Sequence, residues 1–205
     1  MQDDKDTPLA ADIGDELLAG RRHRLGRMPR DMPGWMALIV LVVDTLNLWV
    51  GRTVAWLVLP LMVAMVYEIT ARYVFLAPTI WAFDISRMLY GAMFMLGAAY
   101  ALSRGIHIRA DFLYRNWSVR TQGWVDTVLF LFLYFPALLI FAKLSFDFAV
   151  VSISRGERGM DTAWMPPLGP VKAALAAGVF LLLLQGISEL IKSWYAATRG
   201  RWPDA

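Results

Sequence analysis

Four long apolar segments constrain the fold of this chain more than any other feature. They cover about residues 53–75, 86–103, 124–150 and 170–194, and they leave no room between them for a soluble domain. A helix crosses the hydrocarbon core of a bilayer with ~20 mostly apolar residues, and flanking side chains can snorkel and shorten that need. Because 58% of all residues are hydrophobic, the sequence predicts an all-α membrane protein whose four-helix transmembrane domain covers 53–195.

The N-terminal part of the chain is predicted to lie outside these spans. Residues 1–34 join an acidic stretch to five arginines between positions 21 and 30, with too few apolar residues to fold alone. Over 35–52, Asp44, Asn47 and Gly51 recur at spacings of three and four, which places them on one stripe of a helix. This pattern favours an N-terminal interfacial amphipathic helix over a further span.

The distribution of basic residues predicts how the chain is oriented. Lysine and arginine are concentrated before the first span, in the 103–123 loop and at the C-terminal end, which includes the 196–205 tail. Cytoplasmic loops carry this excess, so both termini are predicted to be cytoplasmic. Since the basic blocks flank apolar segments, the net charge of +3 indicates topology, and we expect no nucleic-acid partner.

The chain offers little material for catalysis. It has no cysteine, which excludes thiolate nucleophiles, cysteine zinc sites and iron–sulfur clusters, and it has only two histidines. His107 lies in "SRGIHIRADFLYR", residues 103–115, where only Ser103 and Asp111 could assist it, and a catalytic site needs more convergent groups. A membrane-integral enzyme built around this loop would lack those companions. We predict an ordered connector with no catalytic residue, no cofactor and no metal.

Two pairs of charged residues lie inside the apolar segments. Glu68 with Arg72, and Lys143 with Asp147, are four residues apart and therefore share a helix face on which they can pair. Each pair is interpreted either as an ion pair that snorkels to the interface or as a contact to a partner helix.

Polar residues also fall near the inner ends of two spans. Asp126 and Glu189 lie there, with Gln185 one turn deeper, and no carboxylate lies near the middle of any predicted span. This argues against an ion-coupled site built from this chain alone. The alternative, an autonomous small homodimeric transporter, needs an essential charge deep in a helix, and its best candidate, Glu68, lies too near an end.

The first three spans carry residues that affect helix shape and packing. Pro60 and Pro136 interrupt apolar helices, which predicts kinks in the first and third spans. Small residues on the second span would let another helix approach closely, with the partner unspecified; they are Gly91, Gly97, Ala98 and Ala101.

Several short motifs between residues 71 and 114 occur together. They are Arg72-Tyr73-Val74-Phe75, Pro78-Thr79-x-Trp81, an acid before Ser86-Arg87, Gly97-Ala98-Ala99-Tyr100 and Gly105-x-His107-Ile108-Arg109-x-Asp111. Together they resemble the small membrane subunit of tripartite ATP-independent periplasmic (TRAP) transporters, the DctQ-like proteins. That family often has paired acids before the Ser-Arg, whereas here Phe83 precedes Asp84, so one acid is carried over.

The resemblance implies a role and partners. In such systems a periplasmic solute-binding protein captures an organic acid or related solute, and a large membrane subunit moves it inward with a sodium gradient. The small subunit is similar to a fixed scaffold in the bacterial inner membrane that supports the elevator motion of its partner. Candidate contacts to the partners or to membrane lipids are Arg72, Thr79, Trp81, Asp84, Ser86, Arg87, Arg104, His107, Arg109 and Asp111.

On the outer side, the sequence also predicts a capping role for Thr79. Its hydroxyl can cap a short helix that carries Ile80, Trp81 and Phe83 at the membrane interface. An aromatic belt with a cap, and a docking surface for a partner, are both open interpretations of this segment.

Overall fold

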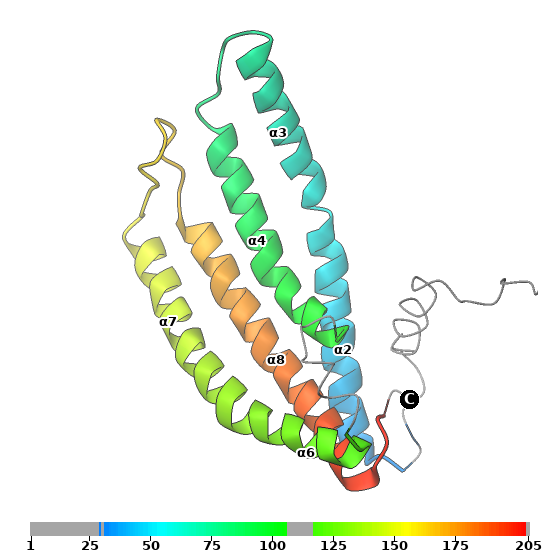
Figure 1. The fold of residues 1–205 in the computed structure, drawn as a ribbon. Helices are drawn as coiled ribbons and strands as arrows, with labels where there is room; N and C mark the ends of the chain where they lie inside the picture. Colours follow the sequence, from blue (N-terminus) through cyan, green and yellow to red (C-terminus); the bar gives the residue numbers. More distant parts are fainter. Residues whose placement is uncertain (1–28, 30, 106–116, 204–205) are drawn as a thin grey trace, which may run out of the picture.

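In the part of the chain that the structure describes there are four long helical segments, as the sequence predicts. The structure is a computed structural model, and it describes residues 29, 31–105 and 117–203. Each of the four segments is long and apolar enough to cross a membrane. They consist of α2 (Gly34–Ala55) followed by α3 (Val58–Tyr73), α4 (Ala82–Ser103), α6 (Val119–Leu129) with the π-helix η1 (Phe130–Tyr134) and α7 (Phe135–Ser154), and α8 (Gly169–Arg199) (Figure 1).

The interfacial amphipathic helix expected over 35–52 is not confirmed. α2 runs into α3 with only a turn at residues 56–57 between them, so that Gly34–Tyr73 forms one apolar segment of 40 residues. At about 1.5 Å per residue it is ~60 Å long, about twice the thickness of the hydrocarbon core. The stripe of Asp44, Asn47 and Gly51 is buried in the protein. A helix that packs against a polar neighbour needs a polar stripe, just as a helix that faces water does.

Helix α8 is the centre of the packing. It packs against α4, α7, α6 and α2, while α3 packs mainly on α4. In one half of the molecule α3, α4, α8 and α7 therefore lie in a row, and at the other end α2 packs on both α4 and α8 (Figure 1).

Two glycines set how closely the helices approach α8. A Cβ on Gly178 would lie 2.5 Å from the carbonyl oxygen of Met95 in α4, and one on Gly123 would lie 2.4 Å from the backbone nitrogen of Ala197. Neither position has room for a side chain, so α4 and α6 rest on the backbone of α8.

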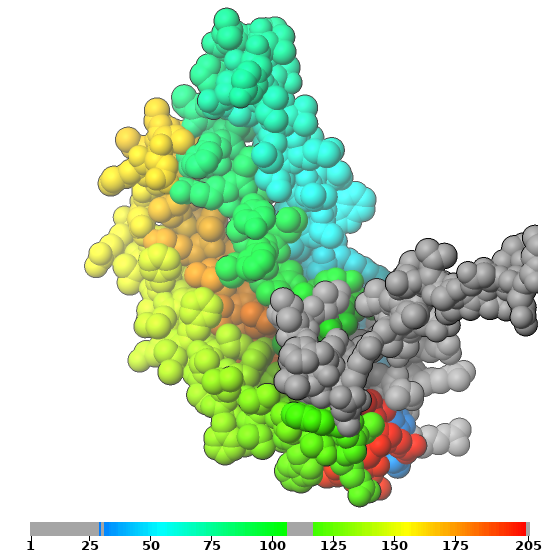
Figure 2. All heavy atoms as spheres, viewed as in Figure 1, coloured from blue at the N-terminus to red at the C-terminus, as the bar shows by residue number. Residues whose placement is uncertain are grey.

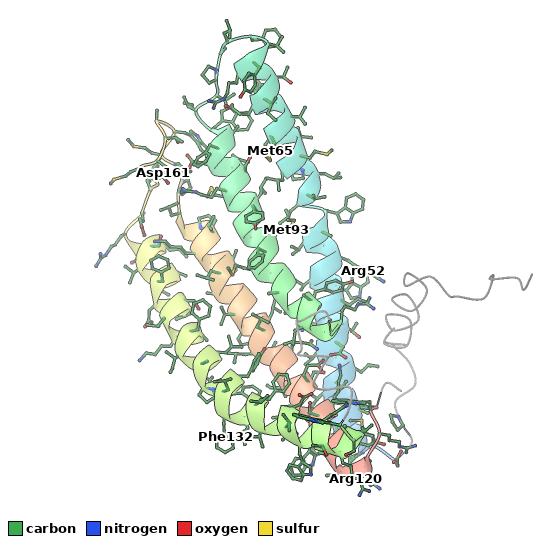
Figure 3. The ribbon with its side chains drawn as sticks, in the orientation of Figure 1. Arg52, Met65, Met93, Arg120, Phe132 and Asp161 are labelled. Atoms are coloured by element: carbon green, nitrogen blue, oxygen red, sulfur yellow. The ribbon has the colours of Figure 1, made fainter. Side chains whose placement is uncertain are left out.

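The third span is bent where the sequence predicts a kink. The Phe135 N–H bonds the carbonyl of Phe130, which is the i→i+5 spacing of a π-turn, and Pro136 follows at the start of α7. The Tyr134 hydroxyl donates to the Leu182 carbonyl of α8 at 2.8 Å, and Phe132 points away from the protein (Figure 3). The bend lays α6 across the end of α8 (Figure 1). In the first span Pro60 falls in the first turn of α3, directly after the turn at residues 56–57.

Candidate functional site

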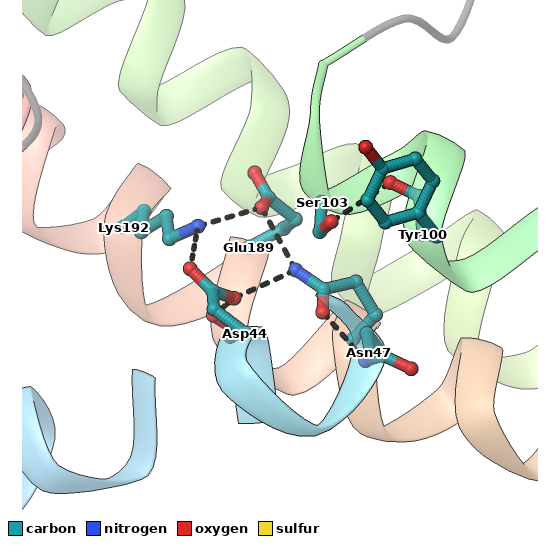
Figure 4. A network of polar contacts seen from close by, with 8 residues as sticks. Asp44, Asn47, Tyr100, Ser103, Glu189 and Lys192 are labelled. Atoms are coloured by element: carbon teal, nitrogen blue, oxygen red, sulfur yellow. Dashed lines mark hydrogen bonds and ion pairs between the residues drawn. The ribbon is translucent and has the colours of Figure 1, made fainter. Parts of the chain in front are cut away.

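The most extensive polar cluster joins α2 to α8 (Figure 4). Two residues of α2 and four of α8 bond to one another, and we call these six the α2–α8 network: Asp44, Asn47, Gln185, Ser188, Glu189 and Lys192. Their spacings of three, four and seven residues place each set on one face of its helix.

Asp44 is the centre of the α2–α8 network. Its Oδ1 accepts from Gln185 Nε2 at 2.9 Å and from Ser188 Oγ at 2.8 Å, while its Oδ2 accepts from Lys192 Nζ at 2.7 Å. Lys192 also donates to Glu189 Oε1 at 2.9 Å. The Gln185 amide extends the chain of bonds, since it accepts from Asn47 Nδ2 at 2.7 Å.

All six residues of the network are buried, and three of them carry formal charge. Lys192 is 1% exposed, and the two carboxylates, Asp44 and Glu189, are each 7% exposed. Charged groups removed from water are tolerated when they are paired and hydrogen-bonded, as they are here. The hydrogen bonds run from one helix to the other, so the network holds α2 and α8 in one register.

A second polar cluster closes the α3–α4 turn. Glu68 pairs with Arg72, whose Nε donates to Glu68 Oε1 at 2.9 Å, which confirms that predicted ion pair. The other oxygen of Glu68 accepts from the Thr79 hydroxyl and from its backbone N–H. Trp81 stacks on Tyr67, with ring centroids 5.7 Å apart.

Thr79 caps the turn before α4. Its hydroxyl accepts the Ala82 N–H at 3.3 Å, although residues 77–81 form no separate short helix and α4 begins at Ala82. The short helix that Thr79 was predicted to cap is therefore not formed. Thr79 instead bonds the first N–H of α4, and the residue directly before α4, Trp81, makes no side-chain capping bond.

A third cluster ties the start of α4 to the α7–α8 loop. Asp84 is fully buried and accepts from the Thr162 hydroxyl, and Arg87 reaches Asp84 at 3.4 Å and Asp161 at 2.6 Å. Figure 3 shows Asp161 in this loop beside the start of α4. The single acid before Ser86-Arg87 thus joins the start of α4 to a loop that lies 78 positions away in the sequence.

The α7–α8 loop is closed by a further pair at its base. Lys172 Nζ lies 2.5 Å from Glu157 Oε2 and 3.7 Å from the ring centroid of Phe148. The Lys172 ammonium holds the pKa of the Glu157 carboxyl below its ordinary value.

At the opposite end, the residues before α2 contact those after α8. Asp31 accepts from Arg201 at 2.5 Å and from the Tyr195 hydroxyl at 3.0 Å. The bond from the Arg201 guanidinium lowers the pKa of Asp31, and Asp31 in turn raises the pKa of Arg201.

The remaining candidate residues are divided between the described and undescribed parts of the chain. Ser86 lies half-buried in the first turns of α4, and Arg104 follows α4 with its guanidinium 5.3 Å from the centre of the Tyr100 ring. His107, Arg109 and Asp111 lie outside the described residues.

The α2–α8 network is the site that sequence reasoning missed. Lys192 looks like a cytoplasmic lysine at the end of a span, and Asp44 looks like part of a solvated stripe. The signal was the matching of two polar stripes, one at 44 and 47 and the other at 185, 188, 189 and 192, which together hold charges of both signs. The expected ion pair of Lys143 with Asp147 is not formed, and both residues are exposed on α7.

Fold and polar clusters together define a polytopic α-helical membrane protein whose buried charges join its own helices. The family model described as "Tripartite ATP-independent periplasmic transporters, DctQ component" matches residues 61–196, about two thirds of the chain. The chain belongs to this family, whose members are components of transporters. No curated protein and no solved structure matches the chain.

Proposed function

We propose that this chain is the scaffold subunit of a TRAP transporter that takes up an organic acid or related solute. In this proposal it supports a large membrane subunit, and a periplasmic solute-binding protein delivers the solute. The sodium gradient drives the transport step in the large subunit. The observation that carries the proposal is the family match over 61–196.

The polar contacts support a static role. In the α2–α8 network, in the cluster around Glu68 and in the cluster around Asp84, residues of this chain bond to one another across helices or loops. Such bonds oppose the relative movement of the elements they join. The effect is strongest in the α2–α8 network, where breaking a buried pair leaves an uncompensated charge. A subunit that stays fixed while its partner moves needs this kind of internal bonding.

We place the chain in the bacterial inner membrane with both termini in the cytoplasm. The basic residues before α2 and after α8 support this orientation. The α3–α4 and α7–α8 loops then face the periplasm, where Arg72, Asp84 and Arg87 order the surface toward the binding protein. On the cytoplasmic side, Arg104, His107, Arg109 and Asp111 are proposed to order the turn after α4 and to contact headgroups or the large subunit.

The test is a pull-down of the tagged chain from its native membrane in mild detergent, followed by mass spectrometry. We expect one larger polytopic protein in a roughly stoichiometric amount, identified as a TRAP large subunit. Isolation of the chain alone, as a homo-oligomer that transports solute in liposomes, would refute the scaffold role. Substitution of Arg109 or Asp111 by alanine should lower the yield of the complex without changing the solute that is taken up.

A further inference from the structure

Helix α7 carries two opposite charges on the side that points away from the rest of the protein. Lys143 and Asp147 are both exposed, and each is two positions from Ser145, which is buried. Two positions turn an α-helix by about 200°, so both side chains lie almost opposite the side of α7 that packs on α8. In Figure 2, α7 (yellow-green to yellow) forms one edge of the molecule, with α8 (orange) between it and α4 (green). We call the outward side around Lys143 and Asp147 the α7 charged face.

The α7 charged face lies deep in the apolar part of the third span. Arg155, the next charged residue after Asp147, follows Lys143 by 12 positions, which is ~18 Å along the helix. In the other direction the nearest charged residue is Asp126, which lies 17 positions before Lys143. Because the hydrocarbon core is ~30 Å thick, Lys143 lies near its middle, too far for its side chain to snorkel to either surface.

The two residues are poorly placed to neutralise each other. On a helix, an acid that precedes a base by four residues pairs better than the reverse order. Glu68 and Arg72 have the better order and are bonded at 2.9 Å, whereas Lys143 precedes Asp147 and the structure forms no ion pair between them. Side chains on a helix lean toward its N-terminus, which favours a Lys143 ammonium that leans away from Asp147.

The surroundings of the α7 charged face decide what can cover it. Charged side chains inside a membrane are costly, and they face a partner, the interior of a bundle or a water-filled cavity. Within the described part of the chain, α7 packs on α8, which lies on the other side of the helix. Lipid tails carry no charge, and lipid phosphates lie at the bilayer surface. The groups that compensate Lys143 and Asp147 must therefore come from protein outside this chain.

A second copy of this chain supplies the wrong charges. Two copies inserted in the same orientation are related by an axis along the membrane normal, so equal positions meet at equal depth. Lys143 would then face Lys143, and Asp147 would face Asp147, which places like charges opposite each other. A bond from Lys143 to Asp147 of the other copy would need the same unfavourable lean of the lysine as a bond within one helix.

We infer that the α7 charged face binds a transmembrane helix of another protein, which presents a carboxylate to Lys143 and a cation or a hydroxyl to Asp147. The carboxylate lies near the middle of the membrane, and the second group lies one helical turn nearer the α7–α8 loop. This inference goes beyond the proposed function, since it states the chemistry of the partner helix and does not depend on which membrane protein supplies it.

The first test is zero-length crosslinking of native membranes with dicyclohexylcarbodiimide, which enters the hydrocarbon core and activates carboxyl groups. A lysine amine in contact with an activated carboxyl displaces the urea and forms an amide, whose two residues mass spectrometry identifies. We expect Lys143 joined to an aspartate or glutamate within a membrane span of another protein. Lys172, 2.5 Å from Glu157 Oε2, is the control and should form an amide within the chain.

Three results of the crosslinking would overturn the inference. They are an amide between Lys143 and Asp147 within one chain, the same amide between two copies, and no amide at Lys143 while Lys172 forms its own. The first result would show an ion pair that compensates itself in lipid. The second would show a homodimer.

The second test removes the lysine charge. Lys143→Leu leaves the partner's carboxylate without a counter-charge, so the recovery of the crosslinked protein in the pull-down should fall about tenfold. Leu144→Ala, at the neighbouring and equally accessible position on α7, is the control and should leave the recovery unchanged. Unfolding of each variant alone in detergent shows whether it is folded. Wild-type recovery with Lys143→Leu would overturn the inference.

The inference and the proposed function can fail separately. If wild type recovers a TRAP large subunit but Lys143 joins only Asp147, the inference is wrong and the scaffold role stands. If Lys143 joins an acid of a different membrane protein and no large subunit is recovered, the inference stands and the scaffold role fails.

Discussion

The α2–α8 network predicts the order of stability of three variants. One of them makes the net charge of the network more negative, and the other two make the network neutral. Asp44 and Glu189 are negative and Lys192 is positive, so these three groups sum to one negative charge. Lys192→Met raises that imbalance, whereas Asp44→Asn and Glu189→Gln each remove it. The hydrogen bonds then separate the last two variants.

The bonds lost in each variant give the magnitudes. Lys192→Met removes two charge-assisted bonds, at 2.7 and 2.9 Å, and leaves two buried carboxylates, which should cost about 3–5 kcal/mol. In Asp44→Asn the amide can still accept from Gln185 and Ser188, but its NH₂ meets the Lys192 ammonium, so we expect about 1–3 kcal/mol. The printed bonds of Glu189 both go to Oε1, an acceptor that a glutamine retains. Glu189→Gln loses only the charge of this acceptor, so it should cost about 0.5–1.5 kcal/mol, the least of the three.

The assay is unfolding of the purified chain in mixed micelles by increasing mole fraction of a denaturing detergent. It can be followed by tryptophan fluorescence, since the chain has nine tryptophans. Ser154→Ala, an exposed hydroxyl on α7 outside the network, serves as the control. If Glu189→Gln destabilises the chain as much as Lys192→Met does, the charge argument is refuted, because the glutamate charge itself would then be required.

Three further predictions concern the ends of the helices and the exposed face of α7. Thr162→Val removes a bond to buried Asp84, so trypsin should cleave the α7–α8 loop at Arg158 faster than in wild type; an unchanged rate would contradict the coupling of this loop to α4. Because Arg201 lowers the pKa of Asp31, the Asp31–Arg201 contact should persist above pH 3.8, the ordinary value, and be lost as pH falls through the lowered pKa; NMR of arginine side chains should show this, and Asp31→Asn should abolish the transition. Replacing both Lys143 and Asp147 by leucine should change the free energy of unfolding by less than about 0.5 kcal/mol in the micelle assay, since the two are exposed and unpaired with each other; a larger loss would reveal a contact between them.

The sequence predicted the helices better than their mutual contacts. The span expected at 86–103 is α4, Ala82–Ser103, and the one expected at 170–194 is α8, Gly169–Arg199, because a long apolar run needs no knowledge of its neighbours. The first span was underestimated because its N-terminal half carries polar residues. Periodicity shows that these residues share a stripe, but not whether the stripe faces water or another helix.

The candidate sites divide in the same way. The Glu68–Arg72 pair was predictable because its members are four residues apart on one helix. Asp84 and Thr162 are 78 positions apart, and Asp44 and Lys192 are 148 apart, so no local pattern connects them. Lysine at the end of an apolar helix normally snorkels to water, and only the packing of α2 on α8 shows that Lys192 is buried.

The π-turn at Phe130–Tyr134 gives the third span one place where its length can change at little cost. A π-turn holds one residue more than the α-helical turn it replaces, so it absorbs a single-residue insertion. Deleting one residue there would restore a regular helix and leave nearly the same face of α7 toward α8. Deleting one residue from the first turns of α7 would instead rotate everything after it by ~100°. Ser145, Ala149 and Ser152, which are now buried, would then turn outward.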